Sequence, residues 1–205
     1  MSRSYFYQEI TCLPDHEISV GFVIGKVMNI LHLALVGVSQ NGKTCPVGIS
    51  FPGYLLPGEK SGEEDSTFPL GNKIRLVALN EADLVGLELS IKLARLSDYV
   101  HISSVRVLQR QVKKYMIYKR FQPKGSKERL IRRQMKRKGK TEEEIISNYA
   151  NLDLRPCDLP FINIRSHSTG ENFRLFIDRI ECEKPTSEWV FSTYGLSSQA
   201  SVPHF

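Results

Sequence analysis

The sequence predicts an α+β protein made of two regions, residues 1–108 and 109–205. In the first region, strand-like and helix-like segments alternate along the chain. A stretch over about residues 126–140 is strongly basic and has helical spacing. After it, short segments alternate apolar and polar residues, which is typical of strands in a small antiparallel sheet. These three observations together indicate the α+β class.

The first region begins with a strand-like segment, residues 4–12, which Pro14 interrupts. Residues 18–36 follow as a helix, because apolar residues recur there at intervals of three and four. Two strands, a second helix and a last strand complete the region, at residues 47–51, 72–79, 81–93 and 100–108. The order strand, helix, strand, strand, helix, strand predicts a ferredoxin-like (RRM-like) domain. RNA-binding modules, enzymes and regulators share this order, so it does not decide the function.

The second region opens with the basic helix. Ser126 is suited to cap it and Gly139 to stop it. Most of its basic side chains fall at offsets of three and four residues and form one face: Arg129, Arg133, Lys136, Arg137 and Lys140. Arg132 widens this face. Such a helix fits a nucleic-acid groove flanked by phosphates, in DNA or at the end or loop of an RNA stem. The alternative is a helix of the ribosomal type that only screens phosphates.

Several further elements follow the basic helix. The Thr-x-x-Glu pattern at residues 141–144 is a capping box and predicts another short helix. Strand-like segments come next, at residues 160–166, 173–180 and about 188–194. We expect these strands to form the small antiparallel sheet of the second region.

Charge is distributed very unevenly along the chain. Residues 106–140 hold 15 Lys and Arg and one acid, Glu128, and so carry a net charge of +14, whereas the rest of the chain carries −8. Such a surplus repels itself unless a polyanion neutralises it. The distribution therefore favours a nucleic-acid partner.

The composition is that of an ordinary globular protein, with 41% hydrophobic and 24% charged residues in 205. No apolar run approaches the ~20 residues that span a bilayer, and the first residues do not resemble a signal peptide. We therefore expect a cytoplasmic protein without a membrane partner. The cysteines do not have zinc-ligand spacing, so a metal site built on them is not expected: Cys12, Cys45, Cys157 and Cys182.

Catalysis by a two-metal mechanism is poorly supported, because acids are nearly absent from the basic region and the rest of the sequence shows no Asp/Glu constellation of the kind that binds metals and no HxH pattern. Cleavage of RNA without metal needs a proton acceptor and a proton donor, and histidine suits both because its pKa of ~6.5 is close to working pH. Of the five histidines, His32 interrupts the apolar helix in ILHLALV. A lone histidine on such a helix is more often a structural residue, so the residues alone leave both roles open.

Six segments, in this order along the chain, match a known family: LHLALV, GISFPGY, KERLIRRQMKR, DLPFINIRS, SHSTGENFRLFI and STYGLSSQASVPHF. Together they resemble the CRISPR-associated endoribonuclease of the type I-F (Ypest) subtype. The match is most specific at Arg165–Ile177 and at Tyr194–Phe205.

The resemblance implies roles for individual residues. His32 is implied as the acid–base residue, Ser166 as the residue that positions the nucleophile, and Tyr194 as the residue that holds the histidine. For binding RNA, it implies that Ser168 and Thr169 contact backbone phosphate and that Phe173 stacks on a base at the foot of the stem. Arg120 and Gln122 are implied to read bases beside the cut. The implied groove-binding cations are Arg132, Arg133, Lys136 and Arg137. Arg129 lies on the same basic face. His167 stands where the family has glutamine, and it adds a second imidazole near the scissile site.

The resemblance also implies a function. The family cleaves precursor CRISPR RNA at the 3′ base of a repeat stem-loop, without metal or another cofactor. Attack by the 2′-OH leaves a 2′,3′-cyclic phosphate and a 5′-OH, and the enzyme stays on the crRNA hairpin within the type I-F Cascade (Csy) complex. One alternative is a non-catalytic protein that binds an RNA hairpin. The other is a generic double-stranded nucleic-acid or ribosomal-type protein, in which the Ser, Thr and Tyr cluster has no role.

Overall fold

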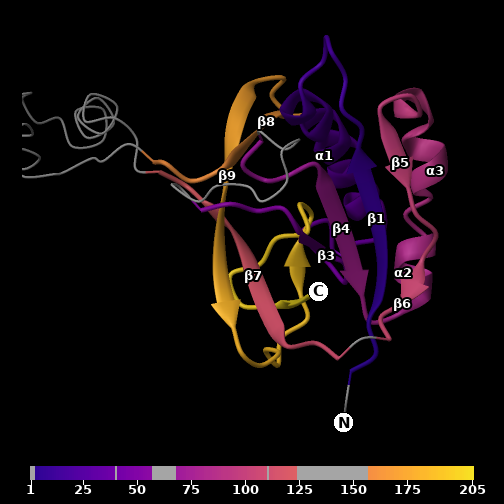
Figure 1. Ribbon diagram of the computed structural model, residues 1–205, viewed down its shortest axis with the longest axis vertical. Coiled ribbons are helices and arrows are strands. Elements are labelled where there is room, and N and C mark those ends of the chain that lie inside the picture. Colours follow the sequence, from indigo (N-terminus) through magenta and orange to yellow (C-terminus); the bar gives the residue numbers. More distant parts are fainter. Residues whose placement is uncertain (1–2, 40, 57–67, 110, 124–156) are drawn as a thin grey trace, which may run out of the picture. The chain divides into compact units, whose positions relative to one another are not determined.

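The structure is a computed structural model, which describes residues 3–39, 41–56, 68–109, 111–123 and 157–205 (Figure 1). The chain forms two compact units. Met1–Phe121 and Leu159–Phe205 make up the first, and Gln122–Asp158 make up the second. The predicted basic helix at 126–140 and the short helix after it lie outside the described residues. The division of the chain at residue 108 stays a prediction; in the structure, both sides of that position contribute to the first unit.

The first unit is a mixed α+β structure with antiparallel sheets. Its larger sheet has the strand order β3-β4-β1-β5, and a short strand, β6, also pairs with β1. The strands are β1 (Phe6–Cys12), β3 (Gly48–Ser50), β4 (Lys73–Ala78), β5 (Val100–Ile102) and β6 (Arg106–Val107). The four predicted strands of the first region are thus confirmed, except that the strand predicted over 100–108 is interrupted and becomes β5 and β6.

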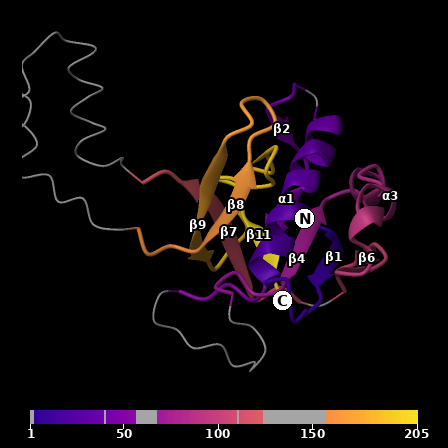
Figure 2. The ribbon, with the colours of Figure 1, turned by 90° about the horizontal axis from the view of Figure 1, so that it is seen from above.

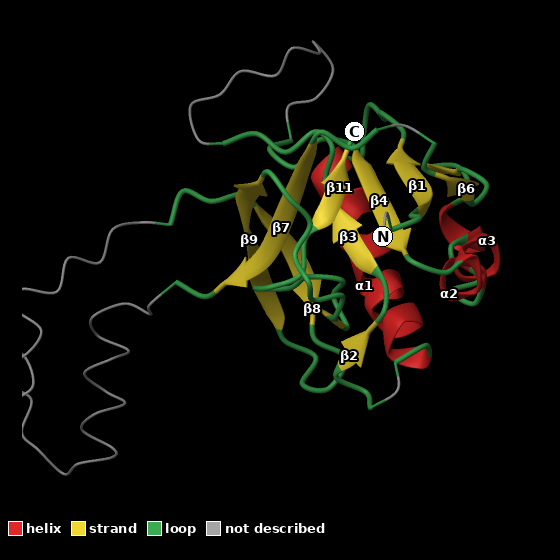
Figure 3. Ribbon diagram, turned by 90° about the horizontal axis from the view of Figure 1, so that it is seen from below, coloured by secondary structure: helices red, strands yellow, loops and turns green. Residues whose placement is uncertain are grey.

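The long helix α1 (Val20–Gly37) confirms the helix predicted at 18–36, with Ser19 as its N-cap. The helix predicted over 81–93 is wrong in its continuity. It divides into α2 (Glu81–Val85) and α3 (Leu89–Lys92), and the 3₁₀ turn η1 (Ala94–Leu96) follows (Figure 3). The break has a local cause. Gly86 ends α2, and Glu88 adopts a left-handed backbone with a φ of 49°.

A second sheet has the order β11-β7-β9-β8, again antiparallel. Its strands are β7 (Lys114–Phe121), β8 (Phe161–Arg165), β9 (Asn172–Cys182) and β11 (Val202–His204). Strands β8 and β9 confirm the predictions at 160–166 and 173–180. Strands β7 and β11 were not predicted. The expectation that the strand at 188–194 joins this sheet is wrong: the strand there is β10 (Phe191–Ser192), and it pairs separately with β2 (Thr44–Cys45).

Helix α1 contacts strands of both sheets, β1 of the larger and β8 of the smaller (Figure 2). Its core face carries fully buried Ile24, Met28, Leu31 and Leu35. At Gly25 the helix comes so close to β8 that an added Cβ would lie 2.7 Å from the backbone oxygen of Asn163. Helix α1 therefore fixes where the β8–β9 hairpin lies relative to the first sheet.

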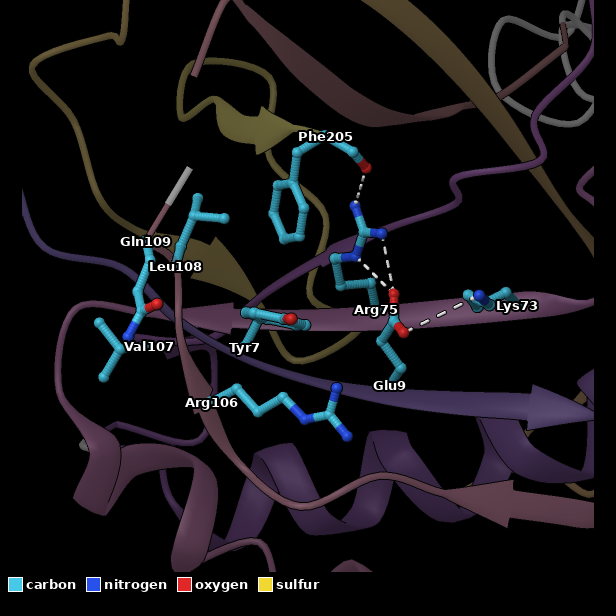
Figure 4. Close-up of a pocket in the computed structure, with 9 residues that line it drawn as sticks. All are labelled: Tyr7, Glu9, Lys73, Arg75, Arg106, Val107, Leu108, Gln109 and Phe205. Carbon is cyan, nitrogen blue, oxygen red and sulfur yellow. Dashed lines mark hydrogen bonds and ion pairs between the residues drawn. The ribbon is translucent and has the colours of Figure 1, made fainter. Parts of the chain in front are cut away.

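A buried arginine ties the first sheet to the end of the described chain (Figure 4). The Arg75 side chain donates to Glu9 Oε1 and to the backbone oxygen of Phe205, at 2.8 Å each, and its guanidinium lies 3.8 Å from the centroid of the Phe205 ring. These groups line a cavity of about 610 Å³, with Lys73 and Tyr7 at its wall. Because Arg75 is only 6% exposed and its guanidinium is already paired, its role there is to join β4, β1 and the segment after β11.

By length and composition alone, α1 would qualify as a membrane-spanning helix. This is weak support for a membrane location, since the core helix of a soluble protein passes the same test, and eight residues of α1 are buried in the first unit.

Candidate functional site

His32 lies in the last third of α1, half-buried, with its ring held from the other end of the chain. Its Nδ1 lies 3.0 Å from the backbone oxygen of Thr193, in the turn after β10. A carbonyl oxygen can only accept, so Nδ1 carries the proton and donates it. In the neutral ring, Nε2 is then the nitrogen left to accept a proton from a substrate.

Tyr194 stacks on His32. The two ring centroids are 4.1 Å apart and the planes differ by 3°. The turn that presents Tyr194 depends on Gly195, whose φ of 68° is left-handed and whose added Cβ would lie 2.5 Å from Ile49 Cγ1. Burial raises the pKa of the Tyr194 hydroxyl, and the Arg120 guanidinium partly offsets this. Tyr194 is therefore a neutral, flat surface that fixes the plane of the imidazole at neutral pH.

The hairpin between β8 and β9 presents the predicted hydroxyl groups at its tip. Ser166 Oγ accepts from the backbone N–H of Thr169 at 3.2 Å and lies 3.1 Å from Ser168 Oγ. The backbone closes the turn from the N–H of Ser166 to the oxygen of Glu171, at 2.8 Å, and Gly170 takes a φ of 70°. Ser166 is half-buried, whereas His167, Ser168 and Thr169 are exposed. The tip is thus a pre-formed group of hydroxyls open to solvent.

The hairpin is joined to the helix that carries His32. Asn29 lies three residues before His32, on nearly the same side of α1, and its Oδ1 accepts from the backbone N–H of Arg165 at 3.3 Å. Arg165 is followed directly by Ser166, and its Nε donates to the oxygen of Gly170 at 3.2 Å. This contact and the close approach at Gly25 hold the base of the hairpin tip against the turn of α1 that precedes His32.

Arg120 and Phe173 also come together. The Arg120 guanidinium lies 5.4 Å from the centroid of the Phe173 ring, a distance typical of a cation–π contact. Arg120 is exposed, at the end of β7, and Phe173 is half-buried on β9. The positive charge of Arg120 also acts to lower the pKa of Tyr194, the residue that stacks on His32. Arg120 therefore interacts with Phe173 and also influences the aromatic partner of His32. Gln122 is exposed and belongs to the second unit.

The remaining predicted RNA-binding residues lie outside the described residues: Arg129, Arg132, Arg133, Lys136 and Arg137. Within the described parts of the chain, no group of three or more His, Cys, Asp or Glu side chains is placed to hold a metal ion.

Sequence reasoning missed three contacts that shape the site. The carbonyl of Thr193 sets the tautomer of His32, and no sequence pattern marks a backbone oxygen. Asn29 could have been found, because its spacing of three from His32 places the two on nearly one side of a helix. Arg165 was part of the hairpin motif, but its contact with the loop was not foreseen.

The sequence of this chain is similar to those of known proteins over nearly its whole length. The family model described as CRISPR-associated protein (Cas_Csy4) matches residues 7–205. The CRISPR-associated endonuclease Cas6/Csy4 of Escherichia coli (strain UTI89 / UPEC) is 33% identical over 200 residues, which cover 97% of this chain and 98% of the relative. The protein of the same name from Pseudomonas aeruginosa (strain UCBPP-PA14) is 33% identical over 199 residues, with the same coverage.

Among solved structures, one of the CRISPR endoribonuclease Cse3 bound to a 19-nucleotide RNA aligns over 98% of this chain and 100% of that chain. Its TM-score of 0.37 and identity of 10% are too low to bear on fold or function. The family match and the two relatives cover nearly the whole chain. The chain therefore belongs to the Csy4 family of CRISPR-associated proteins.

Proposed function

We propose that this protein is an endoribonuclease that processes precursor CRISPR RNA, cutting at the 3′ base of a repeat stem-loop without a metal ion. The observation that carries the proposal is the His32 arrangement: Nδ1 is committed to the Thr193 oxygen, and Tyr194 stacks flat on the ring. Such a ring presents its other nitrogen as a fixed proton acceptor. The relatives named as CRISPR-associated endonucleases support the same conclusion.

The proposed step is an internal attack. Nε2 of His32 takes the proton of the ribose 2′-OH, and the 2′ oxygen forms a bond to the adjacent phosphorus. The bond from phosphorus to the 5′ oxygen breaks, and that oxygen receives a proton from solvent water. The products are a 2′,3′-cyclic phosphate and a 5′-OH, and the imidazole can pass on the proton that it accepted. Ser166 orients the 2′-OH in this step, which adds to the ~10²–10⁴-fold that acid–base help contributes.

The substrate contacts are proposed on both sides of this centre. The exposed hydroxyls of Ser168 and Thr169 bind a backbone phosphate, with His167 beside them. Phe173 stacks on a base at the foot of the stem, and Arg120 and Gln122 read bases beside the cut. The basic face at residues 126–140 binds the stem through the groove. Its surplus of positive charge, a property of the sequence, supports this last assignment.

Two features of fold and assembly belong to the same proposal. The strand order β3-β4-β1-β5, with α1 after the first strand and α2 before the last, supports a ferredoxin-like first region. We further propose that the protein keeps the product hairpin and joins the type I-F Cascade (Csy) subunits in the cytoplasm.

The test uses labelled repeat RNA in EDTA, alone and with one 2′-deoxy nucleotide at the cut. We expect cleavage of the first RNA only, with a 2′,3′-cyclic phosphate on the 5′ fragment. Cleavage of both RNAs, or a requirement for Mg²⁺, would refute the mechanism. Tight, repeat-specific binding without cleavage would instead select the non-catalytic hairpin-binding protein. Weak binding with no sequence preference would select the generic nucleic-acid-binding protein.

A further inference from the structure

A groove runs between the N-terminal half of α1 and β8, the edge strand of the second sheet. Its volume is about 900 Å³. None of the described residues that line it is acidic. They include aliphatic and small residues, and they also include aromatic, amide-bearing and cationic side chains: Phe22, Lys26, Asn29, Phe161, Arg165 and Asn172. This part of the first unit has no assigned role in the proposed reaction.

Two aromatic rings of the groove carry a cation. Phe22 is 56% exposed, although it is a large apolar residue, and the Lys26 ammonium lies 5.0 Å from its ring centroid. The Arg174 guanidinium lies 4.7 Å from the centroid of Phe161. An aromatic face beside a cation is the combination that binds single-stranded nucleic acid, since the ring stacks on a base and the cation binds the phosphate. The amides of Asn29 and Asn172 add groups that can hydrogen-bond to base edges.

The position of the groove relates it to the candidate site. Arg165 and Gly170 line one end, and they stand on either side of the hydroxyl-bearing tip that begins at Ser166. Asn29 lines the groove from the turn of α1 before His32. The groove therefore begins directly beside the residues to which we assigned the ribose and the scissile phosphate.

We propose that this groove binds the single-stranded RNA on the 3′ side of the cut, the segment that leaves with the 5′-OH. The inference rests on the proposed function. In that function Phe173 and Arg120 bind the foot of the stem, so the nucleotides on the 5′ side of the cut already have a binding site. The strand that continues beyond the scissile phosphate starts at Ser166, and the groove, whose described lining residues include no acid, adjoins it. The N-terminus of α1 adds positive potential there.

The test measures affinity for non-cleavable 2′-deoxy repeat RNAs that differ only in their flanks. One RNA ends at the cut. The second continues for about eight nucleotides beyond the cut, on the 3′ side, and the third carries about eight extra nucleotides at its 5′ end instead. This flank length is within the usual range of single-strand binding sites. The variant is Phe22→Ala/Lys26→Ala. The matched control, Ile91→Ala/Lys43→Ala, removes the same kinds of side chain from exposed positions that do not line the groove.

We expect the 3′ flank to tighten binding by wild type, and the groove variant to lose about tenfold in affinity for that RNA alone. The groove variant should keep the wild-type melting temperature and the wild-type affinity for the RNA that ends at the cut. The control variant should have the wild-type affinity for all three RNAs. Equal losses on all three RNAs, or a loss confined to the 5′ flank, would overturn the assignment. Unchanged affinity for every RNA would also overturn it.

Cleavage of the all-ribose RNAs by wild type is followed in parallel. If wild type cuts them but gains nothing from the 3′ flank, the groove proposal alone is wrong. If wild type cuts none of them, the proposed function fails and the groove proposal fails with it.

Discussion

At the scale of single residues, the site depends on how firmly one imidazole is held. Nδ1 of His32 donates a hydrogen bond to the backbone oxygen of Thr193, and the ring of Tyr194 stacks on one face of the imidazole. These contacts leave Nε2 as the nitrogen that can exchange a proton. Neither contact comes from a neighbour in sequence: the Thr193 oxygen is 161 residues away. The histidine is therefore positioned by the folded chain as a whole, and not by its helix alone.

The flat stack predicts that the Tyr194 ring matters more than its hydroxyl. In Tyr194→Phe the stack is kept, so the cleavage rate should stay close to that of wild type. In Tyr194→Ala the imidazole loses this support, and we expect the cleavage rate to fall by about tenfold or more, comparable to the loss when a partner that orients a metal-ligating histidine is removed. Single-turnover cleavage at saturating protein measures both. If Tyr194→Phe is as slow as Tyr194→Ala, the hydroxyl takes part in the chemistry.

Much of the site at this scale was predictable from motif residues, but the contacts between them were not. The order of Ser166, Ser168 and Thr169 within one turn-forming motif already implied a shared hairpin tip. The Thr193 oxygen and the Arg120–Phe173 contact depend on pairing between distant strands. The sequence does not show which residues of two strands lie opposite each other, so it does not specify such distances.

At the scale of elements, the approach of α1 to β8 aligns the two halves of the site. Gly25→Ala places a Cβ against the backbone oxygen of Asn163, which cannot move without its strand. We expect the free energy of unfolding to fall by about 1–3 kcal/mol. The cleavage rate should also fall, because β8 carries the hairpin tip. Urea unfolding and single-turnover cleavage are the measurements.

Gly37→Ala is the matched control, since it is the same change in the same helix with no atom within 4 Å of the added Cβ. It should leave the stability unchanged or raise it by up to about 1 kcal/mol. Equal losses for the two variants would show that helix packing against β8 is not what Gly25 permits.

The elements that sequence reasoning missed share a cause. Strand β7 buries Met116, Ile117 and Tyr118, but it lies within the basic segment and reads as part of a charged surface. Strand β11 is three residues long and includes Pro203, which the pattern of a strand disfavours. Both are strands because of the sheet partners that they meet. The long helix α1, by contrast, has enough turns for its apolar period to be unambiguous.

At the scale of the whole molecule, tyrosine hydroxyls tie the second sheet to the loop after β3. Tyr118, 2% exposed on β7, donates to the oxygen of Phe51 at 3.1 Å, and Tyr54 donates to the oxygen of Ile177 at 2.9 Å. Burial raises the pKa of Tyr118 to about 12. The first unit thus has a buried hydroxyl where its two sheets meet.

This raised pKa predicts a loss of stability in alkali. In the unfolded chain the pKa of tyrosine is about 10, so between about pH 10 and 12 the unfolded state gives up a proton that the folded state keeps. The contribution of Tyr118 is complete below about pH 10 and is lost as the pH rises to about 12. Tyr118→Phe should be less stable at neutral pH by about 1 kcal/mol, and its stability should fall less steeply above pH ~10. Urea unfolding across this range measures both slopes, and identical slopes would contradict the prediction.

In the proposed function, His32 is the acid–base residue of a metal-independent cut. The most direct measurement compares wild type, His32→Ala and His101→Ala in EDTA, by single-turnover cleavage of repeat RNA and by affinity for its 2′-deoxy form. His101 is an exposed histidine on β5 and serves as the matched control. We predict that His32→Ala loses about 10²–10⁴-fold in rate and keeps its RNA affinity, while His101→Ala changes neither. Cleavage by His32→Ala at the wild-type rate would contradict the assignment.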